Sequence, residues 1–361
     1  MAKLGDYVKI RTGKLDANAS SESGQYPFFT CAIEPLKIDS YSYDCECVLV
    51  AGNGDLNVKY YSGKFDAYQR TYIIESMDKT FLDVQYLYFF MDKYLETLRS
   101  QSIGGVIKYI KLGNLTEADI FIPSIERQRK IVQILRKSRE LIFLRKQQLA
   151  KLDELVKARF VEMFGDPSNN PMGWKKQNFE DIALLITDGE HMTPQRTNKG
   201  IYLLSARNIL NHTIQLDDVD YIDEEEYGRI ARRIVPQQGD VLVSCSGSIG
   251  RCCVVPSELK FQMVRSVALI RFNNTINPIF AEWLIATDEL QKQIYTSATQ
   301  SSQANLFQGK IRKLCGYVPP LSLQNQFAAF VERVDKQKQT VQQSLEKLEL
   351  LKKALMQEYF G

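Results

Sequence analysis

"IPSIERQRKIVQIL", at residues 122–135, returns near the end of the chain as "VPPLSLQNQFAAFV", at residues 318–331. At this offset of 196 residues, a proline, a glutamine and a row of apolar residues coincide: Pro123 with Pro319, Ile125 with Leu321, Gln128 with Gln324, Ile131 with Phe327 and Ile134 with Phe330. The match continues without a gap for about 43 residues, until Phe164-Gly165 meets Phe360-Gly361. A register held over this length indicates a rigid element that occurs twice.

Each copy is expected to form one long helix. A proline opens each copy, as is common in a first helical turn, and neither interior contains Gly or Pro. Gly165 ends the first copy and Pro167 follows it, which is a usual C-terminal stop. About 40 residues at a rise of 1.5 Å per residue give a rod of roughly 60 Å.

Residues spaced alternately by three and four positions, most of them apolar, follow one face of each helix. In the first copy they are Ile131, Leu135, Ser138, Ile142, Arg145, Leu149, Leu152 and Val156. In the second copy they are Phe327, Val331, Val334, Lys338, Val341, Leu345, Leu348 and Lys352. The simplest way to bury these faces is against each other, as an antiparallel coiled coil that brings the two chain ends close together. The alternative is a long amphipathic helix that packs on its own domain.

A second, weaker repeat precedes each helix. "LGDYVKIRTGK" (4–14) resembles "FEDIALLITDG" (179–189), and "VLVAGNGDLN" (48–57) resembles "VLVSCSGSIG" (241–250). The segment around Arg70 resembles the segment around Arg265. Short β-branched runs predict strands at "CVLVAG", "RTYIIE", "DVLVSCSG" and "SVALIRF", and apolar spacing predicts helices within 84–98 and 278–295.

The predicted fold class is therefore α+β. Two α/β domains are separated by two long antiparallel helices that form a coiled coil, with a pseudo-twofold internal repeat. The predicted boundaries are 1–122 for the first domain, 123–166 for the first helix, 167–318 for the second domain and 319–361 for the second helix. A Pro/Asn-rich linker, "DPSNNPMGWKK" (166–176), joins the halves.

Composition excludes several classes of protein. The 361 residues are 44% hydrophobic and 25% charged, and no apolar run reaches the ~18 residues of a membrane helix. The start lacks the apolar core of a signal peptide. Seven cysteines without a CxxC pair, and only two histidines, favour reduced thiols in a cytoplasmic protein over a disulfide framework or a metal site.

Charge is distributed unevenly although its sum is only +3. Residues 123–166 carry 11 Lys and Arg against 6 Asp and Glu, a net charge of +5. Residues 1–122 have a net charge of −3, and residues 167–318 are neutral. A polyanion would have to be bound by local patches and not by a globally basic surface.

With this organisation, the chain resembles the specificity subunit of type I restriction-modification systems over essentially its whole length. The resemblance rests on "IPSIERQ" and "VPPLSLQNQ" at the helix starts, the linker "EMFGDPSNNPMGW" and the start "LGDYVKIRTG". The sequence departs from the family where the first "PPL" becomes Pro123-Ser124-Ile125, and where little sequence precedes the first domain.

The resemblance implies a non-catalytic subunit with two target-recognition domains, each reading one half of a split, asymmetric site in double-stranded DNA. Two methyltransferase subunits would dock on the helices, and restriction (motor) subunits would join outside them. No cofactor is expected on this chain, whereas S-adenosylmethionine, ATP and Mg are expected on the partners. The fixed helix length leads us to expect that it sets the gap between the half-sites.

Candidate DNA-binding residues are polar side chains on the predicted loops, because base edges are read by Arg, Lys, Asn, Gln, Ser and Thr. In the first domain they are Thr12, Lys14, Asn53, Tyr68, Gln69, Arg70 and Lys108. In the second domain they are Thr187, His191, Arg196, Arg207, Asn208, Ser246, Ser248, Arg251, Arg265, Gln303 and Asn305. For the helices, candidate partner-binding residues are Arg127, Arg129, Arg136 and Arg139. For each residue, a framework role or a solvated surface is the alternative.

Two stretches of the sequence resemble catalytic motifs only in part. "NNPM" (169–172) lacks the second proline and the aromatic residue of an amino-methyltransferase motif, so a turn is expected. Asp240 with Glu258 and Lys260 has a nuclease-like spacing that arises often by chance. An interaction adaptor with paired protein-binding domains on a coiled coil remains the alternative function, and a free-standing repressor is disfavoured because no helix-turn-helix is evident.

Overall fold

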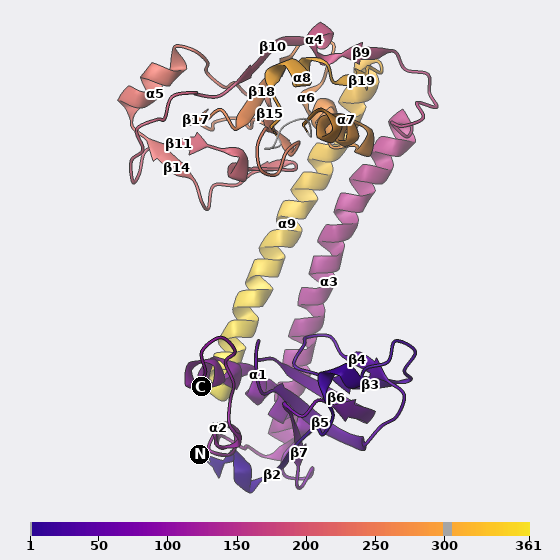
Figure 1. The fold of residues 1–361 in the computed structure, drawn as a ribbon, viewed down its shortest axis with the longest axis vertical. Coiled ribbons are helices and arrows are strands. Elements are labelled where there is room, and N and C mark those ends of the chain that lie inside the picture. Colours follow the sequence, from indigo (N-terminus) through magenta and orange to yellow (C-terminus); the bar gives the residue numbers. More distant parts are fainter. Residues whose placement is uncertain (1, 299–304) are drawn as a thin grey trace. The chain divides into compact units, whose positions relative to one another are not determined.

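The computed structural model describes residues 2–298 and 305–361, and the chain divides into two compact units (Figure 1). The first unit contains residues 1–147 and 342–361, and the second contains residues 148–341. Each long helix therefore contributes one part to each unit. The domain boundaries predicted from the sequence, after residues 122, 166 and 318, divide the chain in another way, into domains and helices. This division stays a prediction.

A mixed sheet forms the centre of the first unit, in the strand order β2-β7-β5-β6-β3-β4. Its strands are β2 (Val8–Thr12), β3 (Tyr26–Phe29), β4 (Leu36–Ile38), β5 (Tyr43–Ala51), β6 (Val58–Ala67) and β7 (Thr71–Ser76). Neighbouring strands are antiparallel except β3 and β6, which are parallel. Helix α1 (Val84–Gln101) packs on this sheet and buries Tyr86, Phe89 and Met91.

The second unit repeats this connectivity. One sheet has the order β10-β18-β15-β16, and another has the order β14-β11-β17. Their strands are β10 (Ala183–Asp188), β11 (Ile201–Leu204), β14 (Asp220–Ile222), β15 (Val241–Ser244), β16 (Cys252–Val254), β17 (Phe261–Met263) and β18 (Val267–Phe272). As in the first unit, one neighbouring pair, β11 and β17, is parallel. Strands β16 and β17 together take the place of the single strand β6.

Smaller elements also correspond. In the first unit these are β1 (Ala2–Lys3) with β8 (Asp119–Ile120), the 3-10 turns Leu4–Asp6 and Ala17–Ala19, and α2 (Leu112–Thr116). In the second they are β9 (Lys176–Asn178) with β19 (Cys315–Tyr317), α4 (Phe179–Ile182), α6 (Pro278–Ile285), α7 (Asp288–Ala298) and α8 (Gln308–Arg312). The second unit adds the turn Ala206–Asn208, the hairpin β12 (Ile209–Leu210) and β13 (Thr213–Ile214), and α5 (Glu224–Ala231).

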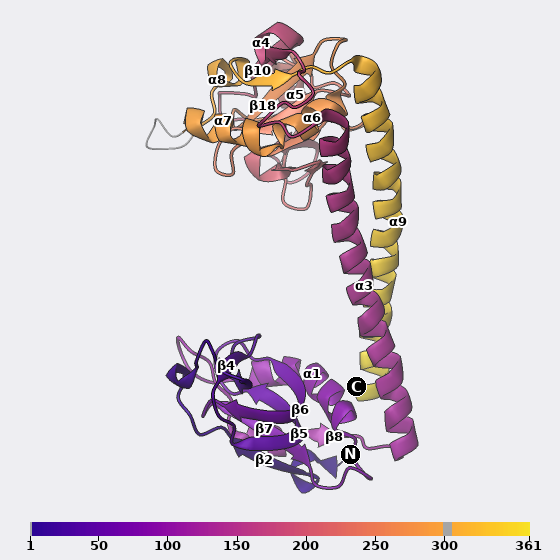
Figure 2. The same ribbon diagram turned by 90° about the vertical axis from the view of Figure 1, so that its right-hand side faces the viewer.

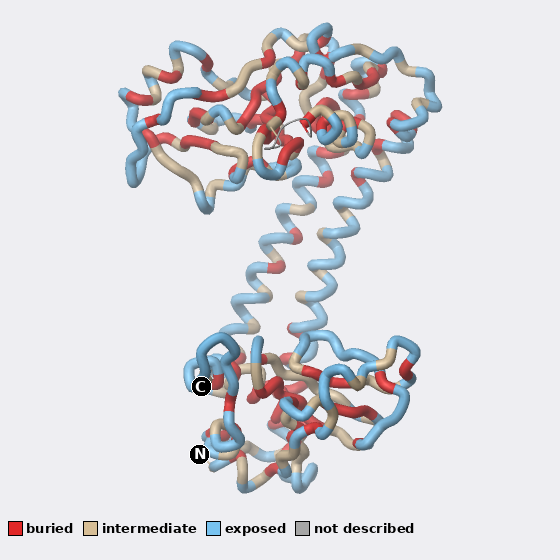
Figure 3. Tube along the Cα trace, in the orientation of Figure 1, coloured by how far each residue is buried: buried red, intermediate tan, exposed pale blue. Residues whose placement is uncertain are grey.

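The long helices are α3 (Ile125–Phe164) and α9 (Leu321–Phe360), and within each unit the parts of the two helices lie side by side (Figures 1 and 2). Their pairing is antiparallel, because α3 residues of rising number meet α9 residues of falling number. In the first unit Lys146 pairs with Glu349 at 2.9 Å, and in the second Asp153 pairs with Lys338 at 2.6 Å. Every residue of the predicted seam is buried or half-buried, while most other helix positions are exposed (Figure 3).

A buried glutamine fixes the start of each long helix. Gln128 is fully buried, and its Oε1 accepts a hydrogen bond from the Asp83 backbone N–H at 2.9 Å. Its Nε2 donates to the carbonyl oxygens of Phe81 and Pro123, at 2.7 and 2.8 Å. Because Asp83 caps the N-terminus of α1, the glutamine ties the start of α3 to the start of α1.

Gln324 makes the equivalent bonds in the second unit. Its Oε1 accepts from the backbone N–H of Asn277, which caps α6, at 2.8 Å. Its Nε2 donates to the carbonyl oxygens of Thr275 and Pro319, at 3.1 and 2.7 Å. The proline and glutamine that recur in the sequence are therefore parts of one polar clamp, in which a buried amide satisfies three backbone groups.

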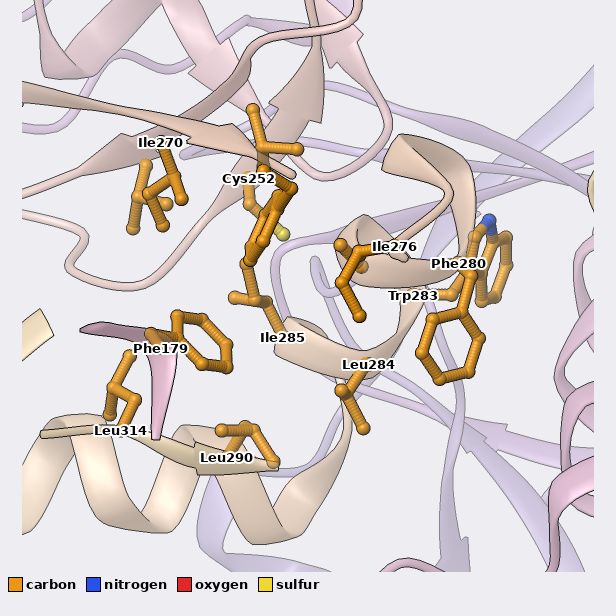
Figure 4. Packing of buried hydrophobic residues seen from close by; sticks show 14 of the residues in the cluster. Phe179, Cys252, Ile270, Ile276, Phe280, Trp283, Leu284, Ile285, Leu290 and Leu314 are labelled. Atoms are coloured by element: carbon orange, nitrogen blue, oxygen red, sulfur yellow. The ribbon is translucent and has the colours of Figure 1, made fainter. Parts of the chain in front are cut away.

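The C-terminal ends of the helices are equivalent as well. Phe164 packs against Phe280 of α6, with ring centroids 4.8 Å apart, in the apolar core whose neighbouring residues Figure 4 shows. Phe360 packs in the same way against Tyr86 of α1, at 5.1 Å. Gly165 and Gly361 follow with φ of +82° and +88°, a left-handed conformation that favours glycine at a helix end. This docking explains why Phe164-Gly165 recurs as Phe360-Gly361.

The sequence predicted these elements well. Strands β5, β7, β15 and β18 lie on the four predicted runs, and α1 covers 84–98. The helix predicted within 278–295 is interrupted, because α6 ends at Ile285 and α7 starts at Asp288. At the break, the Thr287 hydroxyl donates to the Leu284 carbonyl oxygen at 2.6 Å. Among the described residues, no helix is both long enough and apolar enough to cross a membrane.

We expect Gln128→Ala to destabilise the protein by about 2–4 kcal/mol, because it leaves three partly buried backbone groups without their hydrogen-bond partner. The measurement is the free energy of unfolding in urea. Gln147→Ala, at an exposed position of the same helix, is the matched control and should change the free energy by less than about 0.5 kcal/mol. Equal effects of the two substitutions would show that the clamp is not needed.

Candidate nucleic-acid interface

Separate loops of the first unit meet beside the C-terminal end of β2. The Gly13 N–H donates to the Thr71 carbonyl oxygen at 3.1 Å, and the Gln69 N–H donates to Leu15 at 2.9 Å. The Gly52 N–H donates to the Arg70 carbonyl oxygen at 2.7 Å. The Gly54 N–H reaches the Lys108 carbonyl oxygen at 2.9 Å. These bonds place the polar residues of 12–16, 52–54, 68–71 and 103–109 together.

The second unit builds the same loop cluster. The Gly189 N–H donates to the Val267 carbonyl oxygen at 3.0 Å, and the Arg265 N–H donates to Glu190 at 3.0 Å. The Cys245 N–H donates to the Ser266 carbonyl oxygen at 2.8 Å. In place of the Asn53–Tyr109 bridge of the first unit, Ser246 forms a bridge with Asn305.

These bonds correct the sequence-based pairing of Arg70 with Arg265. Thr71 and Val267 accept the same glycine bond, so Arg265 corresponds to Gln69 and Arg70 corresponds to Ser266. The sequence alignment was wrong by one residue because the loops before this turn differ in length. The backbone carries an identical turn in both units, but the side chains on it differ.

Glycine is required where the loops approach most closely. A Cβ on Gly13 would lie 2.0 Å from the Ala67 carbonyl oxygen, and one on Gly189 would lie 2.2 Å from that of Met263. Neither distance is possible without moving the backbone. The recurring glycine after β2 and β10 therefore allows the next segment to join the turn.

In the first unit, three cations border the loop cluster. Lys14, Arg70 and Lys108 are exposed, and none of their side chains forms a hydrogen bond or ion pair with any residue in the ranges 2–298 and 305–361. Gln69 is also exposed, and its Nε2 donates to Asp16 Oδ1 at 2.5 Å. Thr12 is exposed, while Asn53 and Tyr68 are half-buried. The cluster can thus present both positive charge and an oriented amide.

In the second unit, the loop cluster encloses a cavity of about 900 Å³. Predicted residues that line it are His191, Ser246, Arg265 and Asn305, and Asp188, Ser266 and Phe307 also contribute. Arg265 is exposed, and within the described ranges its guanidinium has no hydrogen-bond or ion-pair partner. The cavity therefore has an unoccupied cation, hydroxyls and an amide, which are groups that read base edges.

Asp188 organises one wall of this cavity. Its carboxylate accepts from Gln308 Nε2 at 2.6 Å, from Arg233 at 2.7 Å and from His191 Nε2 at 3.0 Å. Partial burial acts to raise the pKa of Asp188, but the hydrogen bonds from His191, Gln308 and Arg233 outweigh it and lower the pKa. The ionised carboxylate fixes His191 at the cavity edge.

Among the described residues, the groups that resemble parts of catalytic motifs have structural surroundings. Burial raises the pKa of the Cys245 thiol to about 12, so it is not a thiolate nucleophile at neutral pH. Asp240, considered above for its nuclease-like spacing, is buried in a bidentate pair with Arg271, with both distances 2.7 Å. Residues 169–172 form a turn, in which the Asn170 side chain accepts from the Trp174 N–H at 3.0 Å. All seven cysteines are free thiols.

Other predicted contacts lie outside the cavity lining. Arg196 and Arg207 both pair with Asp220, at 3.0 Å each. Asn208 is 1% exposed, and its amide donates to the carbonyl oxygens of Gln215 and Asp218. This burial contradicts a DNA contact by Asn208, because its donors already cap a turn. Thr187 and Arg251 are half-buried, Ser248 is exposed, and Gln303 lies outside the described residues.

The four predicted helix arginines differ in their surroundings. Arg127 and Arg129 are exposed. Arg136 donates to Gln85 Oε1 at 3.4 Å. Arg139 hydrogen-bonds the Tyr88 hydroxyl and lies over its ring, 5.1 Å from the centroid. Part of the predicted partner surface is therefore engaged with α1, which no sequence pattern indicated.

Four residues of these clusters were not predicted from the sequence: Asp16, Asp188, Arg233 and Gln308. Asp16 and Asp188 carry carboxylates, which are not among the side chains expected to read base edges, yet each holds a polar neighbour in place. Arg233 and Gln308 lie 45 and 120 residues from Asp188 along the chain. Only the "TDGEH" segment, which holds Asp188 next to the chosen His191, could have indicated this cluster.

Comparison with sequence families gives one match in each half. A family model described as the type I restriction modification DNA specificity domain matches residues 1–154 and 171–350. The EcoDI specificity subunit of Escherichia coli is 36% identical over 179 residues, which are 49% of this chain and 39% of that protein. The chain thus matches well under half the length of that relative. A putative type I specificity subunit of Haemophilus influenzae is 20% identical over 334 residues, 87% of this chain and 81% of that protein.

Solved structures share the fold. The crystal structure of a type I restriction-modification S subunit from M. genitalium aligns with a TM-score of 0.69 at 15% identity, over 100% of this chain and 95% of that chain. A structure described under the assembly and conformational transition of the type I R-M system has a TM-score of 0.59 at 15% identity, covering 99% and 96%. The paired long helices and repeated domains are therefore an arrangement known in solved proteins.

Asp188→Asn should lower the free energy of unfolding at pH 7 by about 1–3 kcal/mol, because a hydrogen-bonded carboxylate is lost. The folded-state pKa of Asp188 is depressed, so its stabilisation is present above the unfolded pKa near 4 and is lost as the pH falls through the folded value. The stability gap between variant and wild type should narrow below about pH 4. Asp217→Asn, at an exposed position, is the control. A gap that does not change with pH would contradict the assignment.

Proposed function

Because this chain belongs to the type I restriction-modification DNA specificity family, we propose that it is the DNA-recognition subunit of such a system. Each unit would read one half of a bipartite, asymmetric site in double-stranded DNA. The observation that carries the proposal is the repeated loop cluster, in which one backbone framework presents two different sets of polar side chains. Equivalent frameworks with unlike side chains fit two half-sites of unlike sequence.

The chemistry of the two clusters supports DNA as the ligand. Lys14, Arg70 and Lys108 are free to contact phosphates, which give affinity without sequence information. Arg265, Ser246 and Asn305 meet in a cavity whose thiol is buried and protonated. A binding surface with these groups, and without an activated nucleophile among its described residues, fits recognition and leaves catalysis to partners.

The long helices offer a surface for those partners. Apolar side chains on their outer faces in the first unit are exposed: Leu141, Phe143, Leu144, Leu350 and Leu351. Phe143 is 59% exposed and Leu350 is 69% exposed, an unusual amount for large apolar side chains on one short stretch of two helices. We propose that two methyltransferase subunits dock on the long helices and use such exposed side chains, together with Arg127 and Arg129 nearer the start of α3, and that restriction subunits bind further out.

If this chain recognises DNA and its partners carry out catalysis, the cofactors are expected on the partners. S-adenosylmethionine would be bound by the methyltransferase subunits, and ATP and Mg by the restriction subunits. The residues of this chain would then select the site, and their substitution should change which DNA is methylated more than how fast the methyl group is transferred. A protein-binding adaptor would show no such dependence on DNA sequence.

The test is methylation-site mapping with the full chain and its methyltransferase subunits in a host that lacks other methylation. We expect methylation only within a split site, with two specified half-sites of different sequence. Binding of the complex to that site should weaken steeply with salt, since phosphate contacts release counterions. Methylation at a continuous site, or methylation that does not change when this chain is omitted, would contradict the proposal.

A further inference from the structure

One pair of equivalent positions differs between the units in a way that matters for base recognition. Gln69 and Arg265 occupy the second position of matching turns, 68–71 and 264–267. In each turn the fourth residue donates its N–H to the first carbonyl oxygen, at 2.8 Å in one and 3.0 Å in the other. Both side chains are exposed. The backbone therefore presents a neutral amide in the first unit at the place where it presents a guanidinium in the second.

The amide of Gln69 is held in one orientation. Asp16 Oδ1 accepts from Gln69 Nε2 at 2.5 Å, and an ionised carboxylate can only accept, so the nitrogen side of the amide must face Asp16. One N–H of the amide and its Oε1 remain available. A donor next to an acceptor is the pattern that matches N7 and N6–H₂ of adenine in the major groove.

The guanidinium of Arg265 lies in the corresponding place with different neighbours. It lines the cavity of about 900 Å³ with His191 and Ser246, and the residues of the described ranges leave its donors unoccupied. Two parallel N–H donors match O6 and N7 of guanine, the commonest specific contact of arginine with DNA. His191 is held at the cavity wall by Asp188, 3.0 Å from Nε2.

The surroundings of each side chain indicate whether it is better suited to contact a base or a phosphate. Asp16 carries a negative charge next to Gln69, which would repel a phosphate but not a base edge. Lys14 and Arg70, close by in the same loops, are unpaired cations better suited to the phosphates. Arg265 lines a cavity together with hydroxyl and amide groups, so several polar groups could contact a base edge there.

From these contacts we propose that Gln69 and Arg265 are equivalent specificity-determining residues, and that Gln69 reads adenine in one half-site while Arg265 reads guanine in the other. Asp16 is a positioning residue that orients the Gln69 amide. The inference rests on the proposed DNA-recognition function and adds to it the identity of one base pair in each half-site.

The experiment exchanges the two side chains in the full complex and maps methylated sites. Gln69→Arg should change one position of the first unit's half-site from adenine to guanine, and Arg265→Gln should change one position of the other half-site from guanine to adenine. Each change should shift the preference between the two bases by about 10- to 100-fold, as expected for one bidentate contact. The unsubstituted half-site should stay the same.

Matched control variants distinguish a change in base recognition from an effect of the altered charge or of impaired folding. Gln25→Arg and Arg232→Gln make the same changes at exposed positions outside both turns and should leave both half-sites unchanged. Asp16→Ala should relax the adenine preference without altering other positions. If Gln69→Arg does not assemble, Gln69→Ala should relax the same single position. An unaltered site in Gln69→Ala, or a uniform loss of methylation without a new base preference, would overturn the inference.

The outcome for the wild-type complex distinguishes the two proposals. A wild-type map without any split site would refute the proposed function. A split site that lacks adenine in the half-site altered by Gln69 variants, or guanine in the half-site altered by Arg265 variants, would refute the inference alone. A split site with both bases, each retargeted by its own exchange, supports both.

Discussion

The buried glutamine at the start of each long helix is the constraint on which the arrangement depends. Gln128 and Gln324 each join a helix start to the capped N-terminus of a domain helix, through three hydrogen bonds to backbone groups. An aromatic contact from Phe360 or Phe164 holds the opposite end of the other helix on the same domain helix. Each domain is thus attached to the first turn of one long helix and the last turn of the other, which is possible only if the helices are antiparallel.

This attachment explains why the helices recur closely in sequence while the side chains of the loop clusters differ. The clamp, the terminal phenylalanine and the helix seam recur at a constant offset because each must meet a partner in both units. The loop clusters use recurrent backbone bonds and recurrent glycines, such as Gly13 and Gly189, but not recurrent side chains. Side chains at the turn can therefore change without disturbing the core, and this is what the proposed recognition of two unlike half-sites requires.

The sequence was sufficient for the helices because their signal is local: unbroken register, apolar spacing and terminal Gly. It was sufficient for the strand framework but not for its fine register, since loops of different length shifted the pairing of Arg70 by one residue. The partners of individual side chains could not be predicted from the sequence. Asn208 is buried by a turn that only the fold reveals, and Arg139 is engaged by Tyr88 of a distant helix. The contacts of Asp188 join segments up to 120 residues apart.

The most direct measurement of the central claim uses a chain built from two copies of residues 166–361. Its helix pairing should survive, because Asp153, the ion-pair partner of Lys338, corresponds to the acidic residue Glu349 in the second copy. If the units are equivalent reading heads on a twofold framework, methylation mapping with the partner subunits should show a symmetric split site that contains the second half-site twice, in inverted orientation. Retention of the original asymmetric site, or methylation at a single uninterrupted half-site, would contradict the account.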